Sequence, residues 1–172
     1  MKIEEIRKSW RQLVAQKEFK QVAELLRQSP EREKIMQRGR ELCAHTFVFD
    51  HPWDMERCLT PHTMETMNWN QVFNDDEEWT FMLNRMDYWS ALAKAALISQ
   101  DTRYLDQAKD FLLDWITQHP QIEASLSTRT LDTGIRVVNM LECAALLEAA
   151  EKLSEEELTW ILTSVELSLI HI

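Results

Sequence analysis

A scarcity of residues that form tight turns is the strongest constraint on this chain. Only two glycines and four prolines occur among 172 residues, a share of about 3.5% where average usage is about 12%. Strands that are joined by tight turns depend on these residue types for the turns. The sequence therefore predicts an all-α fold.

The size and apolar content of the chain indicate one folded domain. Hydrophobic residues make up 45% of the sequence, and seven tryptophans, six phenylalanines and eight methionines supply bulky side chains for a core. A chain of 172 residues buries about 70% of the surface that it exposes when unfolded. We therefore expect a single α-helical domain over residues 1–172, and wholesale disorder is excluded.

The net charge excludes two classes of partner. Lysines and arginines number 19 against 29 aspartates and glutamates, which gives a formal charge of −10 at pH 7. Neither a basic stripe nor a polybasic run interrupts this acidic background. We therefore expect no nucleic acid and no membrane as a partner.

The cysteines and the N-terminal residues indicate in which cellular compartment the protein is expected. Cys43, Cys58 and Cys143 are odd in number and widely spaced, so they provide neither a disulfide framework nor a zinc cage and favour a reducing compartment. The first residues are charged, and no apolar run approaches the roughly 18 residues of a membrane helix. Neither a signal peptide nor a membrane span is expected, which favours the cytoplasm.

Apolar residues recur every three or four positions along most of the chain, which is the pattern of amphipathic helices. The predicted helical stretches are 3–28 (one or two helices), 31–44, 76–99, 101–119, 129–152 and 154–172. The stretches 76–99 and 101–119 are expected to form an antiparallel hairpin. Successive hairpins of this kind suggest an α-hairpin array, closed or open.

The segment from residue 45 to residue 76 lacks the helical period. Structureless loops of this length are uncommon in compact domains and are usually functional or disordered. Five aromatic side chains in the segment argue against disorder, because aromatic rings in that number need burial or a ligand. We expect a long irregular loop that packs over the helices.

The last helical stretch begins with a capping box, in which Ser154 is followed three residues later by Glu157. It then stays apolar to Ile172 without a polar tail, which is typical of a chain that is cut within a larger architecture. Uncovered apolar helix surface predicts self-association. The alternative is an α-hairpin protein-interaction module, in which this helix binds a peptide or a partner helix.

A series of motifs follows in a fixed order between about residues 45 and 150. The series comprises Asp50-His51-Pro52-Trp53-Asp54-Met55-Glu56, Asn68-Trp69-Asn70, Glu78-Trp79, Leu83-Asn84-Arg85, Asp101-Thr102-Arg103-Tyr104, Asp114-Trp115-Ile116, and Arg129 with Gly134-Ile135-Arg136. The ordered series is more specific than any one motif. It resembles the N-terminal helical domain of the heparinase II/III-like family of polysaccharide lyases, which includes alginate and heparan lyases.

The resemblance implies an incomplete (α/α) toroid, followed in full-length members by more helices and a β-sandwich domain. It also implies β-elimination on uronate-containing glycans, in which a base removes the proton alpha to a carboxylate while a neutralising group holds that carboxylate. The family's Asn-His pair and catalytic Tyr lie beyond this segment, and Tyr88 and Tyr104 occupy positions suited to helix packing. We therefore expect no catalytic residue and no cofactor in this chain, which would be inactive alone.

An acidic glycan is recognised by arginines, which bind carboxylate or sulfate through two hydrogen bonds, and by tryptophans, which stack on sugar rings. The predicted substrate-binding residues are His51, Trp53, Arg57, Trp69, Asn84, Arg85, Arg129 and Arg136. A scaffold ion pair is the alternative for each arginine, as for Arg136 with Asp132 one helical turn earlier. For Arg85 the candidate partners are Asp54, Glu56 and Asp87. Core packing is expected for Trp79, Trp89 and Trp115.

Two other chemistries have weaker support in the sequence. Three histidines at positions 45, 51 and 62, with Asp50 and Asp54, match no recurring metal-binding spacing, so no metal site is predicted. The carboxylates at 75–78 would suit a glycosidase-type toroid, but their place at a helix N-terminus explains them through capping and the helix dipole. A periplasmic location would fit the resemblance as well as a cytoplasmic one.

Overall fold

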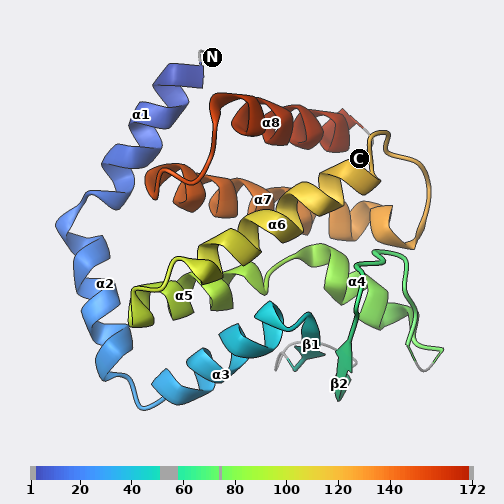
Figure 1. Ribbon diagram of the computed structural model, residues 1–172. Coiled ribbons are helices and arrows are strands. Elements are labelled where there is room, and N and C mark those ends of the chain that lie inside the picture. Colours follow the sequence, from blue (N-terminus) through green and yellow to red (C-terminus); the bar gives the residue numbers. More distant parts are fainter. Residues whose placement is uncertain (1–2, 51–57, 74, 171–172) are drawn as a thin grey trace.

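The computed structural model describes residues 3–50, 58–73 and 75–170. Within these residues the chain forms eight α-helices, one short 3-10 helix and one two-stranded sheet, so the all-α prediction is confirmed (Figure 1). The elements are α1 (Ile3–Val14), α2 (Lys17–Gln28), α3 (Arg32–Cys43), β1 (Thr46–Phe49), β2 (Cys58–Thr63), α4 (Glu77–Arg85), α5 (Trp89–Ser99), α6 (Arg103–Gln118), η1 (Leu126–Thr128), α7 (Thr130–Ala149) and α8 (Glu155–Ile170).

The helix α7 organises the others. Its 20 residues span about 30 Å, and it contacts α1, α4, α5, α6 and α8. Figure 1 shows α7 in the middle of the molecule, with α8 along one side and α1 and α2 at the left edge. The expected hairpin of α5 and α6 is present, since the two helices contact each other and run in opposite directions.

The predicted helix 76–99 is wrong in one respect, because it is two helices. The helix α4 ends at Arg85, and Met86 adopts the left-handed conformation with φ 58° before α5 begins. Side chains of α7 satisfy the carbonyl groups that the break leaves open: Arg136 donates to Asn84 O at 3.3 Å and Asn139 donates to Arg85 O at 2.7 Å. The break is therefore a tertiary effect, without a glycine or proline to signal it.

The predicted irregular loop 45–76 contains an antiparallel hairpin of β1 and β2, so the prediction is wrong for these residues. Thr46 pairs with Thr63 and Phe47 with His62, and the register shifts between Phe47 and Phe49. Both phenylalanines are buried, and each packs edge-on against the ring of Trp79. The segment does pack over the helices, as expected.

Other local expectations are confirmed. In the capping box, Glu157 N donates to Ser154 Oγ at 3.1 Å, and Ser154 N donates to the Glu157 carboxylate at 2.8 Å. Both tyrosines are buried in the core, as are Trp79 and Trp115, whereas Trp89 is only partly buried. Among the described residues, none of the helices has both the length and the apolarity that crossing a bilayer requires.

Candidate functional site

Five of the eight predicted substrate-binding residues belong to one cluster, at the place where α4 contacts both η1 and α7. These five residues are Trp69, Asn84, Arg85, Arg129 and Arg136. The remaining three lie outside the described residues: His51, Trp53 and Arg57. We call the five, with Asp132, the α4–α7 cluster.

The inner part of the α4–α7 cluster is built on Asn84, which is fully buried. Its Nδ2 donates to Trp69 O at 2.7 Å and to Thr80 O at 2.8 Å, and its Oδ1 accepts from Trp115 Nε1 at 3.0 Å. The Trp69 ring is also buried, and its Nε1 donates to Asp114 at 2.8 Å. In this structure both residues connect the loop before α4 to α6, and neither reaches the surface.

Arg136 is a cation inside the core. Its Nη1 donates to Ser127 O at 2.9 Å and to Asn84 O, its Nη2 donates to Thr133 Oγ1 at 2.9 Å, and its guanidinium stacks 4.2 Å from the ring centroid of Trp115. Burial lowers the pKa of Arg136 to about 10, so the group stays protonated at neutral pH. The carbonyl groups that it holds belong to α4 and η1, which Arg136 therefore ties to α7.

Asp132 joins the other two arginines. This carboxylate is fully buried; its Oδ1 accepts from Arg85 Nε at 2.7 Å, and its Oδ2 accepts from Arg129 Nε. Arg85 also donates to Glu78 at 3.0 Å, and the Arg129 guanidinium lies 3.5 Å from the ring centroid of Phe81. The side chain of Arg129 is 37% exposed and that of Arg85 16%, so Arg129 is the group most open to solvent.

The partners of Arg85 differ in part from those that the sequence suggested. It forms ion pairs with Glu78 and Asp132, while Asp54 and Glu56 lie outside the described residues. Three guanidinium groups thus lie among three carboxylates, those of Glu78, Asp132 and Asp114, so acidic side chains compensate the positive charge of this part of the chain.

The model of the family described as Heparinase II/III N-terminus matches residues 7–172. The chain belongs to the heparinase II/III N-terminal family. No curated protein and no solved structure matches it.

Sequence reasoning missed two polar residues that support the site of this heparinase II/III N-terminal chain. His119 stacks on Trp115 with ring centroids 4.1 Å apart, and its two nitrogens lie 2.7 Å from Trp115 O and 2.7 Å from Ser127 Oγ. The buried Ser127 also donates its backbone N–H to Asn70 Oδ1 at 3.0 Å. Burial lowers the pKa of His119. The one sequence feature that pointed to these contacts was Asn70, which stands beside Trp69 in the motif Asn68-Trp69-Asn70.

Two of the three histidines in the possible metal site, His45 and His62, pack against aromatic rings in this heparinase II/III N-terminal chain. His62 stacks on Phe73 with ring centroids 4.1 Å apart, and His45 packs against Phe111. In the described ranges, no three side chains of His, Cys, Asp or Glu come together as a metal-binding group would. His51 and Asp54 lie outside those ranges.

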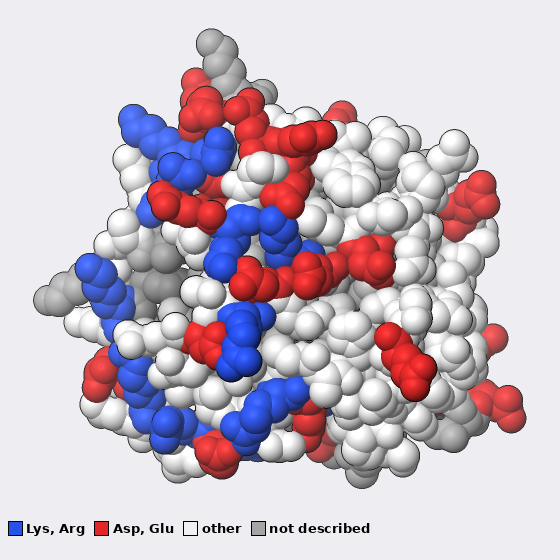
Figure 2. Space-filling model, in the orientation of Figure 1, with Lys and Arg blue, Asp and Glu red and all other residues white. Residues whose placement is uncertain are grey.

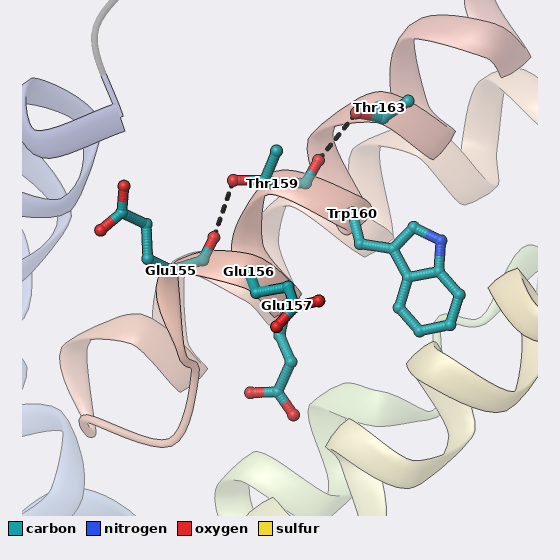
Figure 3. A pocket seen from close by; sticks show the side chains of 6 residues that line it. All are labelled: Glu155, Glu156, Glu157, Thr159, Trp160 and Thr163. Carbon is teal, nitrogen blue, oxygen red and sulfur yellow. Dashed lines mark hydrogen bonds between the residues drawn. The ribbon is translucent and has the colours of Figure 1, made fainter.

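A separate hollow lies along α8 and differs in chemistry from the α4–α7 cluster (Figure 3). It is lined by Glu155, Glu156, Glu157, Thr159, Trp160 and Thr163. Both threonine hydroxyls donate to backbone oxygens one turn earlier, at 2.7 and 2.9 Å. Three carboxylates make this hollow unsuited to an acidic glycan.

The surface charge of the heparinase II/III N-terminal chain is uneven on the face that Figure 2 shows. Lysine and arginine side chains lie over the side of α1, α2 and α3 and over the middle of this face, where acidic side chains are interspersed with them. The opposite side of this face presents mainly uncharged atoms and separate acidic groups. On this face, positive charge is therefore local and partly compensated.

Proposed function

We propose that this heparinase II/III N-terminal chain forms one wall of the substrate groove in a polysaccharide lyase that acts by β-elimination on uronate-containing glycans. Its helices would form part of an incomplete (α/α) toroid. The observation that carries the proposal is the convergence of Arg85 and Arg129 on one buried carboxylate, Asp132, at the junction of α4 and α7. This arrangement holds the partly exposed guanidinium of Arg129 in a fixed place.

Fixed arginines suit the chemistry of a uronate. The planar guanidinium matches a carboxylate through two parallel hydrogen bonds, and a positioned cation offsets the charge that develops when the neighbouring proton is removed. The net charge of −10 opposes an anionic ligand at long range. Screening limits that repulsion to a reach of about 8 Å at physiological salt, so a ligand at Arg129 is influenced mainly by the charges close to it.

The tyrosines support the proposal that the chain is inactive when isolated. The chain has two tyrosines, Tyr88 and Tyr104, and both are buried. Burial raises the pKa of Tyr88 well above its usual value, which is the opposite of what a catalytic base requires. A tyrosine base for β-elimination would then come from elsewhere in the parent enzyme.

The test is a calorimetric titration of the chain with alginate, heparan and hyaluronan oligosaccharides, with ultraviolet absorbance followed for new unsaturated ends. Binding of at least one oligosaccharide without a rise in absorbance is expected. Absence of binding to all three would contradict the groove assignment. A rise in absorbance would contradict the assignment of catalysis to other parts of the enzyme.

We also propose that the chain self-associates, because rows of apolar side chains remain uncovered on α7 and α8, in addition to a pair, Val22 and Leu25, on α2. Leu131, Ile135 and Val138 are exposed on one face of α7. Trp160, Leu167 and Ile170 are exposed at helical spacing on α8, and Trp160 is 45% exposed beside the acidic hollow (Figure 3). The same faces favour the alternative function, a module that binds a partner helix.

A further inference from the structure

We infer that Arg129 is the residue of the α4–α7 cluster that binds the uronate carboxylate, and that Asp132 positions it. This inference rests on the proposed function and divides the roles within the same site. Asp132 is a positioning residue in this assignment, because it acts on the ligand only through Arg129.

Burial and hydrogen bonding distinguish Arg129 from the two other arginines. Arg136 is fully buried and uses both terminal nitrogens on backbone and hydroxyl oxygens. Arg85 uses Nε on Asp132, Nη2 on Glu78 and Nη1 on the Met82 sulfur. Within the described part of the chain, the side chain of Arg129 donates only from Nε, so Nη1 and Nη2 remain available to a ligand.

Two contacts fix the direction of the Arg129 side chain. Asp132 accepts from Nε, and the ring of Phe81 lies under the guanidinium, 3.5 Å from ring centroid to Cζ. The backbone is fixed as well, because Arg129 O accepts from Thr133 N at 2.9 Å and from Thr133 Oγ1 at 3.0 Å. A guanidinium held at Nε and on one face presents the edge with Nη1 and Nη2, which matches the two oxygens of a carboxylate. Such preorganisation reduces the entropy that binding costs.

The negative charge of Asp132 allows its positioning role to be tested by whether its removal weakens or strengthens uronate binding. A carboxylate this close to a bound uronate repels it, so a substitution that only removes this charge strengthens binding. If Asp132 instead holds Arg129 in its binding geometry, the same substitution weakens binding. Asp132→Asn therefore separates a positioning residue from a charge that only opposes the ligand.

The experiment measures the affinity of the chain for the uronate oligosaccharide that binds best, in wild type, in four variants of the α4–α7 cluster and in one control variant. Arg129→Gln is expected to weaken binding by about tenfold or more, since a hydrogen bond to a charged group is lost. Arg129→Lys keeps the charge but loses the paired geometry, and a loss of several-fold is expected. Asp132→Asn is expected to weaken binding, and to have no further effect when it is combined with Arg129→Gln.

The matched control is Arg103→Gln, which removes the same charge at the start of α6. Arg103 is 85% exposed and pairs with Asp101 two residues earlier, so its loss leaves the α4–α7 cluster intact. Unchanged affinity is expected for this variant. Circular dichroism and a thermal melt check that each variant folds. If Asp132→Asn does not fold, Arg129→Lys, which keeps a positive charge beside Asp132, still tests whether Arg129 binds the uronate.

The outcomes separate the inference from the proposed function. A wild-type chain that binds none of the oligosaccharides overturns the proposed function, and the inference with it. Wild-type binding that Arg129→Gln leaves unchanged overturns the inference alone. Tighter binding by Asp132→Asn overturns the positioning role of Asp132 and leaves Arg129 assigned.

Discussion

The carboxylate of Glu148, near the end of α7, accepts a hydrogen bond of 2.9 Å from Nε of Arg7 in α1, across 141 positions of sequence. Arg11, one turn further along α1, donates to the same oxygen at 2.8 Å. Glu148 is fully buried, whereas the side chains of Arg7 and Arg11 are 19% and 43% exposed. The first helix is therefore held to the centre of the molecule by a buried anion and two cations that reach solvent.

The first prediction follows from this asymmetry. Replacing both Arg7 and Arg11 with Met is expected to lower Tm by several degrees more than Glu148→Gln does. The double variant leaves a buried carboxylate without its ion pairs, while Glu148→Gln leaves two arginines that water can solvate. Thermal unfolding followed by circular dichroism measures Tm for the wild type, the double variant and Glu148→Gln. A larger loss from Glu148→Gln would contradict the view that burial of the carboxylate is the dominant cost.

The second prediction concerns pH. Burial lowers the pKa of His119, so the folded chain binds a proton less readily at this ring than the unfolded chain, whose histidine pKa is about 6.5. The neutral His119 ring therefore contributes its full stabilisation above the unfolded-state pKa of about 6.5. This contribution is lost as the pH falls below that value. The expected slope is at most about 1.4 kcal/mol per pH unit.

Urea unfolding at pH values from about 8 to about 5, which bracket the reference pKa of histidine, measures this effect. The control is His119→Gln, because other groups also titrate in this range. The difference in unfolding free energy between wild type and this variant is expected to shrink as pH falls. A difference that stays constant with pH would contradict the role of the neutral ring between Trp115 O and Ser127 Oγ.

The helices were largely predictable from sequence, because apolar residues recur at helical spacing along most of them, and Asp76 and Ser154 cap the starts of α4 and α8. The break after Arg85 was not, because it depends on Arg136 and Asn139, which lie more than 50 positions away and hold the last carbonyl groups of α4. The strand β1 has an alternating pattern of burial, but its four residues are too short to identify without the partner strand.

The residues of the candidate site could be predicted from the sequence, but the burial of each residue could not. Arg129 and Arg136 stand three positions before and four positions after Asp132, so helix geometry places both beside it. One reaches solvent over Phe81, and the other is buried against Trp115. That difference is set by how α7 packs on α4 and α6, which no local pattern in the sequence records.

The third prediction concerns the uncovered face of α8. Trp160→Lys together with Leu167→Lys is expected to reduce self-association, because both side chains are exposed on that helix. Light scattering over a range of protein concentrations measures the mean mass. The control Leu25→Lys changes a 68% exposed leucine on α2, outside the α8 face, so it should leave the mass unchanged because the contact is assigned to α8. A wild-type chain that stays monomeric at every concentration would contradict self-association.

The fourth prediction uses the two glycines, which both lie inside helices but in opposite surroundings. A Cβ at Gly39 would meet the Cβ of Ala95 at 2.7 Å and the ring of Tyr104 at 3.0 Å, because α3 lies close to α5 and α6 there. A Cβ at Gly134 would meet nothing within 4 Å. Gly39→Ala is therefore expected to destabilise the fold by about 1–3 kcal/mol, since crowding outweighs the gain in helix propensity.

Gly134→Ala should instead stabilise the fold by about 0.5–1 kcal/mol, because only the helix propensity changes. Chemical denaturation gives both free energies of unfolding under one condition. The opposite signs test the packing of α3 directly, since the two substitutions are chemically identical. Stabilisation by Gly39→Ala would mean that α3 does not approach Ala95 and Tyr104 as closely as the structure places it.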